Sequence, residues 1–211
     1  MILIVDNDAI LKLAAFDLLN ASCNLFRVEP SAVVVLPSAK YYFRQKRDKL
    51  TEKYTFAGVD RAIAFVENAS PITQTTNPDD ADMLSGIEFL DAGELQLFAH
   101  TRDIPESILM TGDKRCLRAL ANSSKARPVY TRMSHRIVCL EVLVQSLIVT
   151  IGFDAVRASI VPAMKCDTAI RACFGSGYHA LEESVIPALN SYIEELEREV
   201  GDHWLKHRLT R

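Results

Sequence analysis

The sequence predicts an α/β domain with a mainly parallel sheet, followed by a helical C-terminal extension. Three short aliphatic runs, at residues 2–5, 32–36 and 107–111, each end at polar residues and are followed by a helical pattern. This alternation is typical of parallel strands joined by right-handed crossovers. From about residue 137 the pattern is helical. We therefore expect an α/β domain over residues 1–136 and an extension over residues 137–211 that packs on it.

The elements of the first half follow from where aliphatic runs stop and periodic patterns start. A short aliphatic run bounded by polar residues is typical of a buried strand. Ser38, after Pro37, suits the cap of a following helix. The expected elements are a strand at 2–5, a helix at 8–20, a strand at 32–36, helices at 39–53 and 59–68, and a surface loop at 70–78.

Two helix starts stand out in the second half. Asn77 and Pro78, followed by acidic residues, have the pattern of an N-cap and a first helical position. Asp91 and Glu94 have the spacing of a capping box. The expected elements are helices at 78–90 and 91–101, a strand at 107–111, a helix at 115–122, a short strand at 128–131, and helices from 137 onward.

The end of the chain carries one apolar stripe at helical spacing. Its residues recur at intervals of three and four: Leu181, Val185, Leu189, Tyr192, Leu196 and Val200. The rest of that helix is acidic, and Pro187 indicates that the helix kinks or begins there. A packing face for the same chain is favoured over a dimer interface, and a homo-oligomer remains the alternative.

Composition is that of an ordinary globular protein. Of the 211 residues, 49% are hydrophobic and 24% charged, and the formal net charge is −3. The most apolar segment, 137–153, is short for a membrane span and contains Glu141 and Gln145, which favours a buried helix and no membrane partner. Asp6 and Asp8 interrupt the apolar run at the N-terminus, so no signal peptide is expected. The five cysteines are spread without metal-site spacing, which favours free thiols and a cytoplasmic location.

Acidic residues follow two of the predicted strands. Asp6 and Asp113 each come after an aliphatic run, and neighbouring parallel strands would place both within reach of one cation. Clustered carboxylates repel each other unless a hard divalent cation neutralises them. Glu94 is a third candidate, although a capping box explains it equally well. The sequence therefore suggests a Mg²⁺ or Mn²⁺ site that assists phosphodiester hydrolysis.

Four segments, in this order, resemble the PIN-domain nucleases: LIVDNDAILKLA, VVVLPSAKYYF, LDAGELQLFAHT and ILMTGDKRCLRAL. The resemblance covers roughly residues 1–131. It implies a three-layer α/β/α sandwich, a Mg²⁺ or Mn²⁺ cofactor and cleavage of single-stranded RNA, that is, a metal-dependent endoribonuclease. By the same resemblance, Asp6, Glu94 and Asp113 are the catalytic and metal-binding acids, with Asp91, Asp8 and Thr111 as candidates for a further ligand. Many bacterial members are toxins of toxin–antitoxin pairs, which implies a protein inhibitor as a possible partner.

An interval rich in cations and free of acids follows Asp113. Residues 114–136 contain no carboxylate, and such a run beside a metal site would contact phosphates. The candidate RNA-binding residues are Lys114, Arg115, Arg118, Lys125, Arg127 and Arg132, and Arg136 ends the interval. The alternative is a basic surface without a ligand, or one that pairs with the acidic C-terminal helix.

Two other functions remain open. Asp6 and Asp8 also resemble the nucleophile and acid of haloacid dehalogenase-like phosphatases, with Thr111 as the second motif. The second alternative is a PIN-like interaction module with an incomplete site. It is favoured by Lys40, which stands where the nuclease family commonly has a glutamate.

Overall fold

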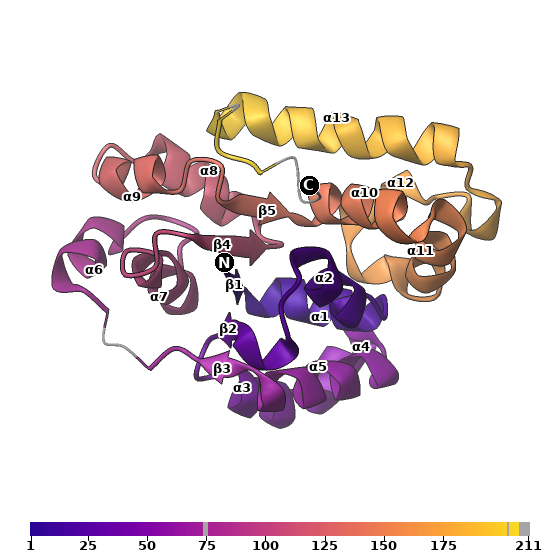
Figure 1. The fold of residues 1–211 in the computed structure, drawn as a ribbon, viewed down its shortest axis with the longest axis horizontal. Helices are drawn as coiled ribbons and strands as arrows, with labels where there is room; N and C mark the ends of the chain where they lie inside the picture. The colour runs from indigo at the N-terminus through magenta and orange to yellow at the C-terminus, as the bar shows by residue number, and fades with distance from the viewer. Residues whose placement is uncertain (74–75, 202, 207–211) are drawn as a thin grey trace.

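The computed structural model describes residues 1–73, 76–201 and 203–206, and it shows an α/β protein built on one parallel sheet (Figure 1). In the described residues the sheet has five strands in the order β3-β2-β1-β4-β5, and every neighbouring pair is parallel. The expected parallel sheet is therefore confirmed. The strands are β1 Ile2–Val5, β2 Val33–Val35, β3 Ser70–Pro71, β4 Ser107–Thr111 and β5 Ile137–Cys139.

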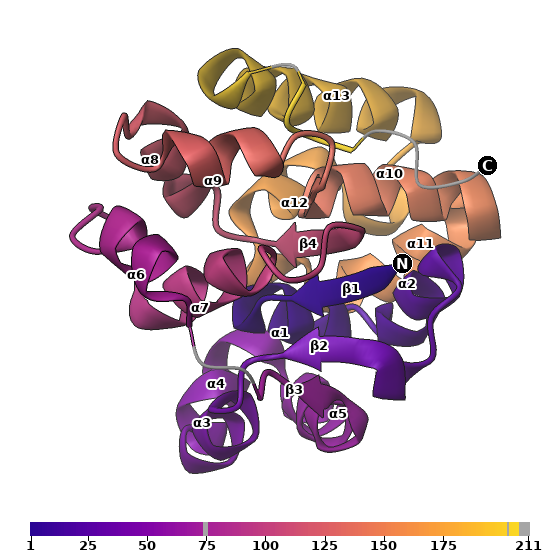
Figure 2. The ribbon, with the colours of Figure 1, turned by 60° about the vertical axis from the view of Figure 1, so that its left-hand side comes forward.

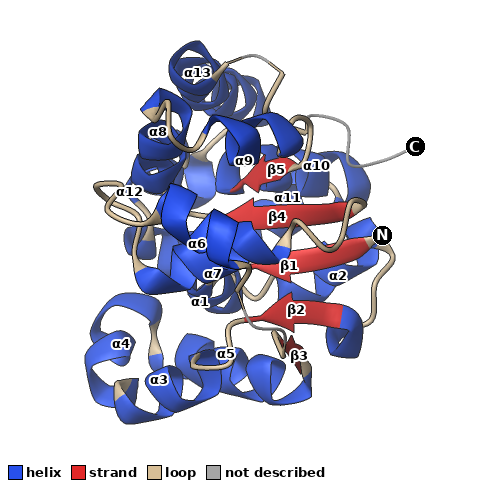
Figure 3. Ribbon diagram, turned by 90° about the vertical axis from the view of Figure 1, so that its left-hand side faces the viewer, coloured by secondary structure: helices blue, strands red, loops and turns tan. Residues whose placement is uncertain are grey.

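Helices lie on both faces of this sheet, as expected of a three-layer arrangement. Figure 3 shows α6, α7 and α9 in front of the strands and α1, α2 and α10 behind them. The α-helices are α1 Asn7–Ala15, α2 Leu19–Phe26, α3 Ala39–Gln45, α4 Arg47–Tyr54, α5 Phe56–Asn68, α6 Pro78–Leu84, α7 Ala92–His100, α8 Lys114–Asn122, α9 Arg127–Arg132, α10 Leu140–Ile151, α11 Phe153–Ile160, α12 Thr168–Cys173 and α13 Glu182–Val200. Short 3-10 helices are η1 Pro30–Ala32, η2 Val161–Cys166 and η3 Gly177–His179.

The central strand β1 lies in the core between β2 and β4. Leu3 pairs with Val33 on one side and with Ile108 on the other. Leu3 and Ile4 are fully buried, as expected of a strand covered by helices on both faces. This burial explains why the strand is an uninterrupted aliphatic run in the sequence.

The order of the strands places a crevice between β1 and β4. After β1 the chain builds β2 and β3 on one side, and it then crosses back to add β4 and β5 on the other. The connections that leave β1 and β4 therefore turn to opposite faces of the sheet, which opens a crevice at the carboxyl ends of the two strands. Asp6 and Asp113 follow these strands.

Two expectations about the third quarter of the chain are wrong. Residues 128–131 lie in helix α9 instead of a strand, because Pro128 occupies a first-turn position, where proline favours a helix. The fifth strand is β5, at the start of the region expected to be helical. Its three apolar residues run directly into α10, and periodicity alone does not separate so short a strand from a helix. The sheet thus continues past the boundary expected at residue 136.

Several predicted helices are shorter than expected. The helix expected at 8–20 divides into α1 and α2, with Asp17 at φ 58° between them. The helix expected at 39–53 divides at Lys46 into α3 and α4. Helix α6 ends at Leu84 instead of residue 90, and the segment that follows contains two left-handed residues, Gly86 and Phe89. The loop expected at 70–78 begins with the short strand β3, and its residues 74–75 lie outside the described residues.

The C-terminal region packs against the rest of the chain along α13. Its buried positions, Val185, Leu189, Ile193, Leu196 and Val200, form the predicted stripe with small differences, while Leu181 is exposed. Pro187 lies inside the helix. Figures 1 and 2 show α13 beside α8 and α10. The intramolecular packing face is therefore confirmed.

No single helix of the described residues has the length and apolar character needed to cross a membrane. The pair α1 and α2 passes that test only when taken together, and the chain bends by 116° between the two helices. The apolar segment that begins at residue 140 forms α10, whose Glu141 is buried and paired with Lys114.

Candidate metal centre

A cleft of about 450 Å³ lies at the carboxyl ends of β1 and β4. It brings together all five acids that the sequence suggested: Asp6, Asp8, Asp91, Glu94 and Asp113. Leu11, Leu36 and Leu50 contribute apolar surface to its walls. The expected convergence of Asp6, Glu94 and Asp113 is thus observed in one cleft.

Asp6 lies at the bottom of the cleft and is 7% exposed. Its backbone N–H donates to the Met110 carbonyl, and its side-chain Oδ2 accepts a hydrogen bond of 3.3 Å from Thr111 Oγ1. Burial, together with the neighbouring charges of Asp8 and Glu94, raises the pKa of Asp6 to about 7. An ionised Asp6 is therefore unfavourable unless a positive charge approaches it.

Glu94 and Asp91 form the predicted capping box at the start of α7. The Asp91 N–H donates to Glu94 Oε2 at 2.7 Å, and the Glu94 N–H donates to Asp91 Oδ1 at 2.8 Å. Burial, with a smaller contribution from Asp91 and Asp113, raises the pKa of Glu94 to about 7. A carboxylate has about four lone-pair positions, so this capping role leaves Glu94 able to bind a cation.

Asp113 caps the start of α8 and forms the opposite wall. Its Oδ1 accepts from the backbone N–H groups of Arg115 and Cys116 at 2.8 and 3.4 Å. Its Oδ2 lies 3.1 Å from the Arg115 guanidinium. Although burial acts in the opposite direction, the hydrogen bonds and charge of Arg115 hold the pKa of Asp113 below its ordinary value. Asp113 is therefore better suited than Asp6 or Glu94 to stay ionised.

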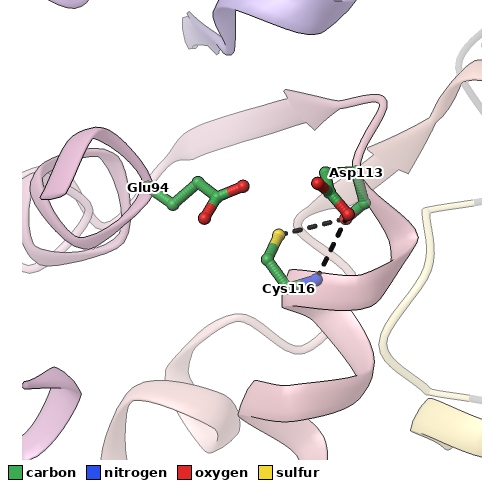
Figure 4. Close-up of side chains that lie close together, drawn as sticks. All are labelled: Glu94, Asp113 and Cys116. Atoms are coloured by element: carbon green, nitrogen blue, oxygen red, sulfur yellow. Dashed lines mark hydrogen bonds between the residues drawn. The ribbon is translucent and has the colours of Figure 1, made fainter. Parts of the chain in front are cut away.

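Glu94 and Asp113 approach each other beside a thiol. The ligand atoms of Glu94, Asp113 and Cys116 all lie within 4.8 Å of one another, and Figure 4 shows Glu94 reaching from α7 toward Cys116 on α8 and Asp113 at its N-cap. The Cys116 thiol donates to the Asp113 backbone carbonyl at 3.0 Å. Burial, with the nearby carboxylates, raises the pKa of Cys116 well above the usual range, so the thiol stays protonated. The carboxylate oxygens of Glu94 and Asp113, and not the Cys116 sulfur, are therefore the atoms available to bind a cation.

Asp8 belongs to a buried ion-pair network that sequence reasoning missed. Its Oδ2 lies 2.5 Å from Lys12 Nζ, and its Oδ1 accepts a 3.0 Å hydrogen bond from the Tyr54 hydroxyl. Lys12 also pairs with Asp167 at 2.8 Å. Although burial opposes it, the charges of Asp8 and Asp167 raise the pKa of Lys12. Both oxygens of Asp8 are thus engaged, which favours a supporting role over that of a general acid.

The sequence held a signal for only part of this network. Asp8 and Lys12 are four residues apart on α1, the spacing at which oppositely charged side chains meet on a helix. Asp167 and Tyr54 come from distant parts of the chain, and no local pattern links them to Asp8. Asp8 does lie in the first turn of α1, as the sequence indicated.

The donor set suits a hard divalent cation. Carboxylate and amide oxygens are the ligands that Mg²⁺ and Mn²⁺ prefer. Asn7 lines the same cleft, and its Oδ1 is one of two buried side-chain atoms without a hydrogen-bond partner in the described part of the chain. A cation held by Asp6, Glu94 and Asp113 would relieve the raised pKa values of the first two acids. The residues present therefore fit such an ion.

The cations after Asp113 have divergent environments. Lys114 pairs with buried Glu141 at 2.5 Å, and Arg118 pairs with Glu199 of α13 at 2.6 Å. Arg132 pairs with fully buried Asp80 and donates to the Phe98 carbonyl, so it holds α9 against α6 and α7.

The remaining cations of this interval differ in what they contact. Arg127 lies over the Tyr130 ring, and Lys125 lies 3.8 Å from Asp82. Arg136 donates to the backbone carbonyls of Arg132, Ile104 and Ser107. Of the six candidate RNA-binding residues, Arg115 is the one that reaches the rim of the cleft, through its pair with Asp113.

Neither a protein-family model, nor a curated protein, nor a solved structure matches this chain. The side chains of the cleft are therefore what an assignment of function rests on. The most informative among them are Asp6, Glu94 and Asp113, because they come from three separate segments of the chain and line one cleft.

Proposed function

We propose that the protein is a divalent-metal-dependent endoribonuclease that hydrolyses phosphodiester bonds of single-stranded RNA. The observation that carries the proposal is the convergence of Asp6, Glu94 and Asp113 on one cleft at the crevice between β1 and β4. The resemblance of residues 1–131 to PIN-domain nucleases supports the choice of RNA as substrate. An antitoxin partner stays a prediction of that resemblance.

The raised pKa values of Asp6 and Glu94 support a cation in this cleft. Both acids have a pKa of about 7 because they are buried close to other carboxylates. A bound cation favours their ionised forms, since an opposite charge at close range lowers the pKa of a carboxylate. Sites in which burial and like charges shift pKa values in this way are frequent at catalytic centres.

Side chains in and beside the cleft have separate proposed roles. Asp6, Glu94 and Asp113 hold Mg²⁺ or Mn²⁺, and the Asn7 amide oxygen is available as a further ligand. When bound, such an ion acidifies water and stabilises negative charge on phosphate oxygens. Thr111 fixes the orientation of Asp6, and the Lys12–Asp8 pair fixes the first turn of α1. Arg115, 69% exposed in its side chain, binds a phosphate of the substrate.

Metal binding is tested by thermal unfolding with and without Mn²⁺. A ligand at 100 times its dissociation constant stabilises a protein by about 2.7 kcal/mol, which corresponds to a shift of roughly 5–10 °C for a chain of this size. We expect this shift in the wild type and its loss in Asp6→Asn and Asp113→Asn. Asparagine caps a helix as well as aspartate does, so Asp113→Asn keeps the start of α8 intact. Asp48→Asn, at an exposed position of α4, is the matched control and keeps the shift.

Catalysis is tested with a labelled single-stranded RNA in Mn²⁺, Mg²⁺ or EDTA. We expect internal cleavage that requires the metal and is abolished by Asp6→Asn or Asp113→Asn. Cleavage that persists in EDTA and in both variants would refute the proposal. Binding of RNA without cleavage in any metal would instead support the interaction module.

A further inference from the structure

A second groove lies beside the metal cleft, and the side chain of Arg115 lies between the two. It has a volume of about 560 Å³ and is lined by residues 85–89 and by one side of α8, with Lys125 at its edge. This volume falls within the range of roughly 300–1,000 Å³ that small-molecule sites occupy. Figures 1 and 2 show α6 and α8, the elements next to this groove, at the same end of the molecule.

Phe89 presents an aromatic face in this groove. Its side chain is 56% exposed, although a phenylalanine of a globular protein is usually buried. Its backbone is left-handed, with φ 61°, in the segment between the end of α6 and Asp91. A non-glycine residue in that region is strained, and such conformations cluster at functional sites. The backbone therefore holds an exposed ring at the expense of local stability.

Arg115 connects the groove to the metal cleft. One side of its guanidinium is paired with Asp113 Oδ2 at 3.1 Å, and its centre lies 5.9 Å from the centroid of the Phe89 ring. A group that binds next to Phe89 is therefore within one side chain of the acid cluster.

The charge of the groove favours an anionic ligand. Its lining contains three cations, Arg115, Arg118 and Lys125, and one carboxylate, Glu88. The pair of Lys125 with Asp82 is exposed and the pair of Arg118 with Glu199 is partly exposed, and ion pairs in contact with solvent are held only weakly. Both cations can therefore exchange these partners for a phosphate. Asn122 and Ser123 add hydrogen-bonding groups.

We propose that this groove binds a nucleotide of single-stranded RNA next to the phosphodiester held in the metal cleft. Phe89 stacks on the base, Arg115 and Arg118 contact the backbone phosphates, and the acid cluster takes the neighbouring linkage. An exposed aromatic ring among cations, adjoining a cluster of metal-binding acids, matches the chemistry of a single strand with unpaired bases. The assignment rests on the proposed function, because it takes the neighbouring cleft to hold the metal ion and the phosphodiester.

The test is fluorescence anisotropy of a fluorescein-labelled 12-nucleotide oligoadenylate RNA in EDTA, where the probe remains intact. Loss of one stacked base costs about 1–3 kcal/mol, so we expect Phe89→Ala to weaken binding about 5-fold or more. Phe89→Leu keeps the apolar volume without a ring and is expected to weaken binding similarly, whereas Phe89→Trp retains it. Tyr178→Ala, at a 60% exposed aromatic residue of η3, is the control and leaves affinity unchanged. Circular dichroism checks that each variant is folded.

The possible results separate the groove from the nuclease proposal. If the wild type cleaves RNA while Phe89→Ala and Phe89→Leu bind as tightly as it does, the groove assignment is wrong and the nuclease stands. If binding depends on Phe89 but no metal supports cleavage, the groove stands and the nuclease fails. No binding of the RNA by the wild type overturns the groove assignment. Equal binding of the matching oligodeoxyadenylate overturns the choice of RNA.

Discussion

Replacing Asp6 by asparagine is expected to change how the stability of the metal-free protein depends on pH. Asp6 is 7% exposed, and burial is the main reason that its pKa rises from the ordinary 3.8 to about 7. Asparagine has nearly the same shape and its carbonyl still accepts the Thr111 hydrogen bond, but it cannot ionise. The substitution therefore removes the titration with little change in packing.

The sign follows from the direction of the pKa change. Because the pKa is higher in the folded protein than in the unfolded chain, the folded state retains its proton over the window from about pH 4 to about pH 7. The contribution of protonated Asp6 to the free energy of unfolding is therefore fully present below about pH 4 and is lost as the pH rises through 7. A rise from 3.8 to about 7 corresponds to roughly 4 kcal/mol, at about 1.4 kcal/mol per pKa unit.

Urea unfolding followed by far-UV circular dichroism in EDTA, from pH 4 to pH 8, measures this effect. We expect wild type to lose a few kcal/mol relative to Asp6→Asn across that range, so that the variant is the more stable protein at pH 8. Asp48→Asn should follow the wild-type curve. A stability difference between wild type and Asp6→Asn that stays constant with pH would refute the reasoning, because it would mean that Asp6 ionises as easily as it does in water.

Three further substitutions test how the cleft is supported. Arg132→Met removes a partner of fully buried Asp80 and should lower the free energy of unfolding by about 3 kcal/mol, as measured by urea titration. Because Arg132 is engaged within the fold, the RNA affinity of the molecules that remain folded should equal that of the wild type. Lys12→Met leaves Asp8 and Asp167 without their shared cation and should cost a similar amount, more at pH 7 than at pH 4. Gly112→Ala places a Cβ against the Asp8 carboxylate and should reduce both the melting temperature and its shift with Mn²⁺; an unchanged shift would show that Asp8 has no influence on the metal.

The sequence predicted the parts of the fold that have strong local signals. Aliphatic runs bounded by polar residues marked β1, β2 and β4, and the Asp91–Glu94 spacing marked a capping box that is present. Strand β5 was missed because its three apolar residues merge with α10 into one apolar segment. Helix α9 was mistaken for a strand because β-branched and aromatic residues outweighed the first-turn proline.

The candidate site was predictable where its residues follow strands or belong to a local motif such as the Asp91–Glu94 capping box. Asp6 and Asp113 could be paired from the sequence, because parallel strands end at one edge of a sheet. Asp167 and Tyr54 reach Lys12 and Asp8 through contacts between distant segments, which no local spacing reveals. The sequence shows that cations follow Asp113 without any acid among them. Which of these cations are paired, buried or at the rim of the cleft depends on contacts that only the folded structure shows.

Anomalous scattering from a crystal soaked in Mn²⁺ tests the metal centre most directly. The account predicts one anomalous peak among the carboxylates of Asp6, Glu94 and Asp113, within the cleft that also contains Asn7. The peak should disappear in Asp6→Asn crystals treated in the same way. An empty cleft at saturating Mn²⁺, or a peak elsewhere on the chain alone, would contradict the account.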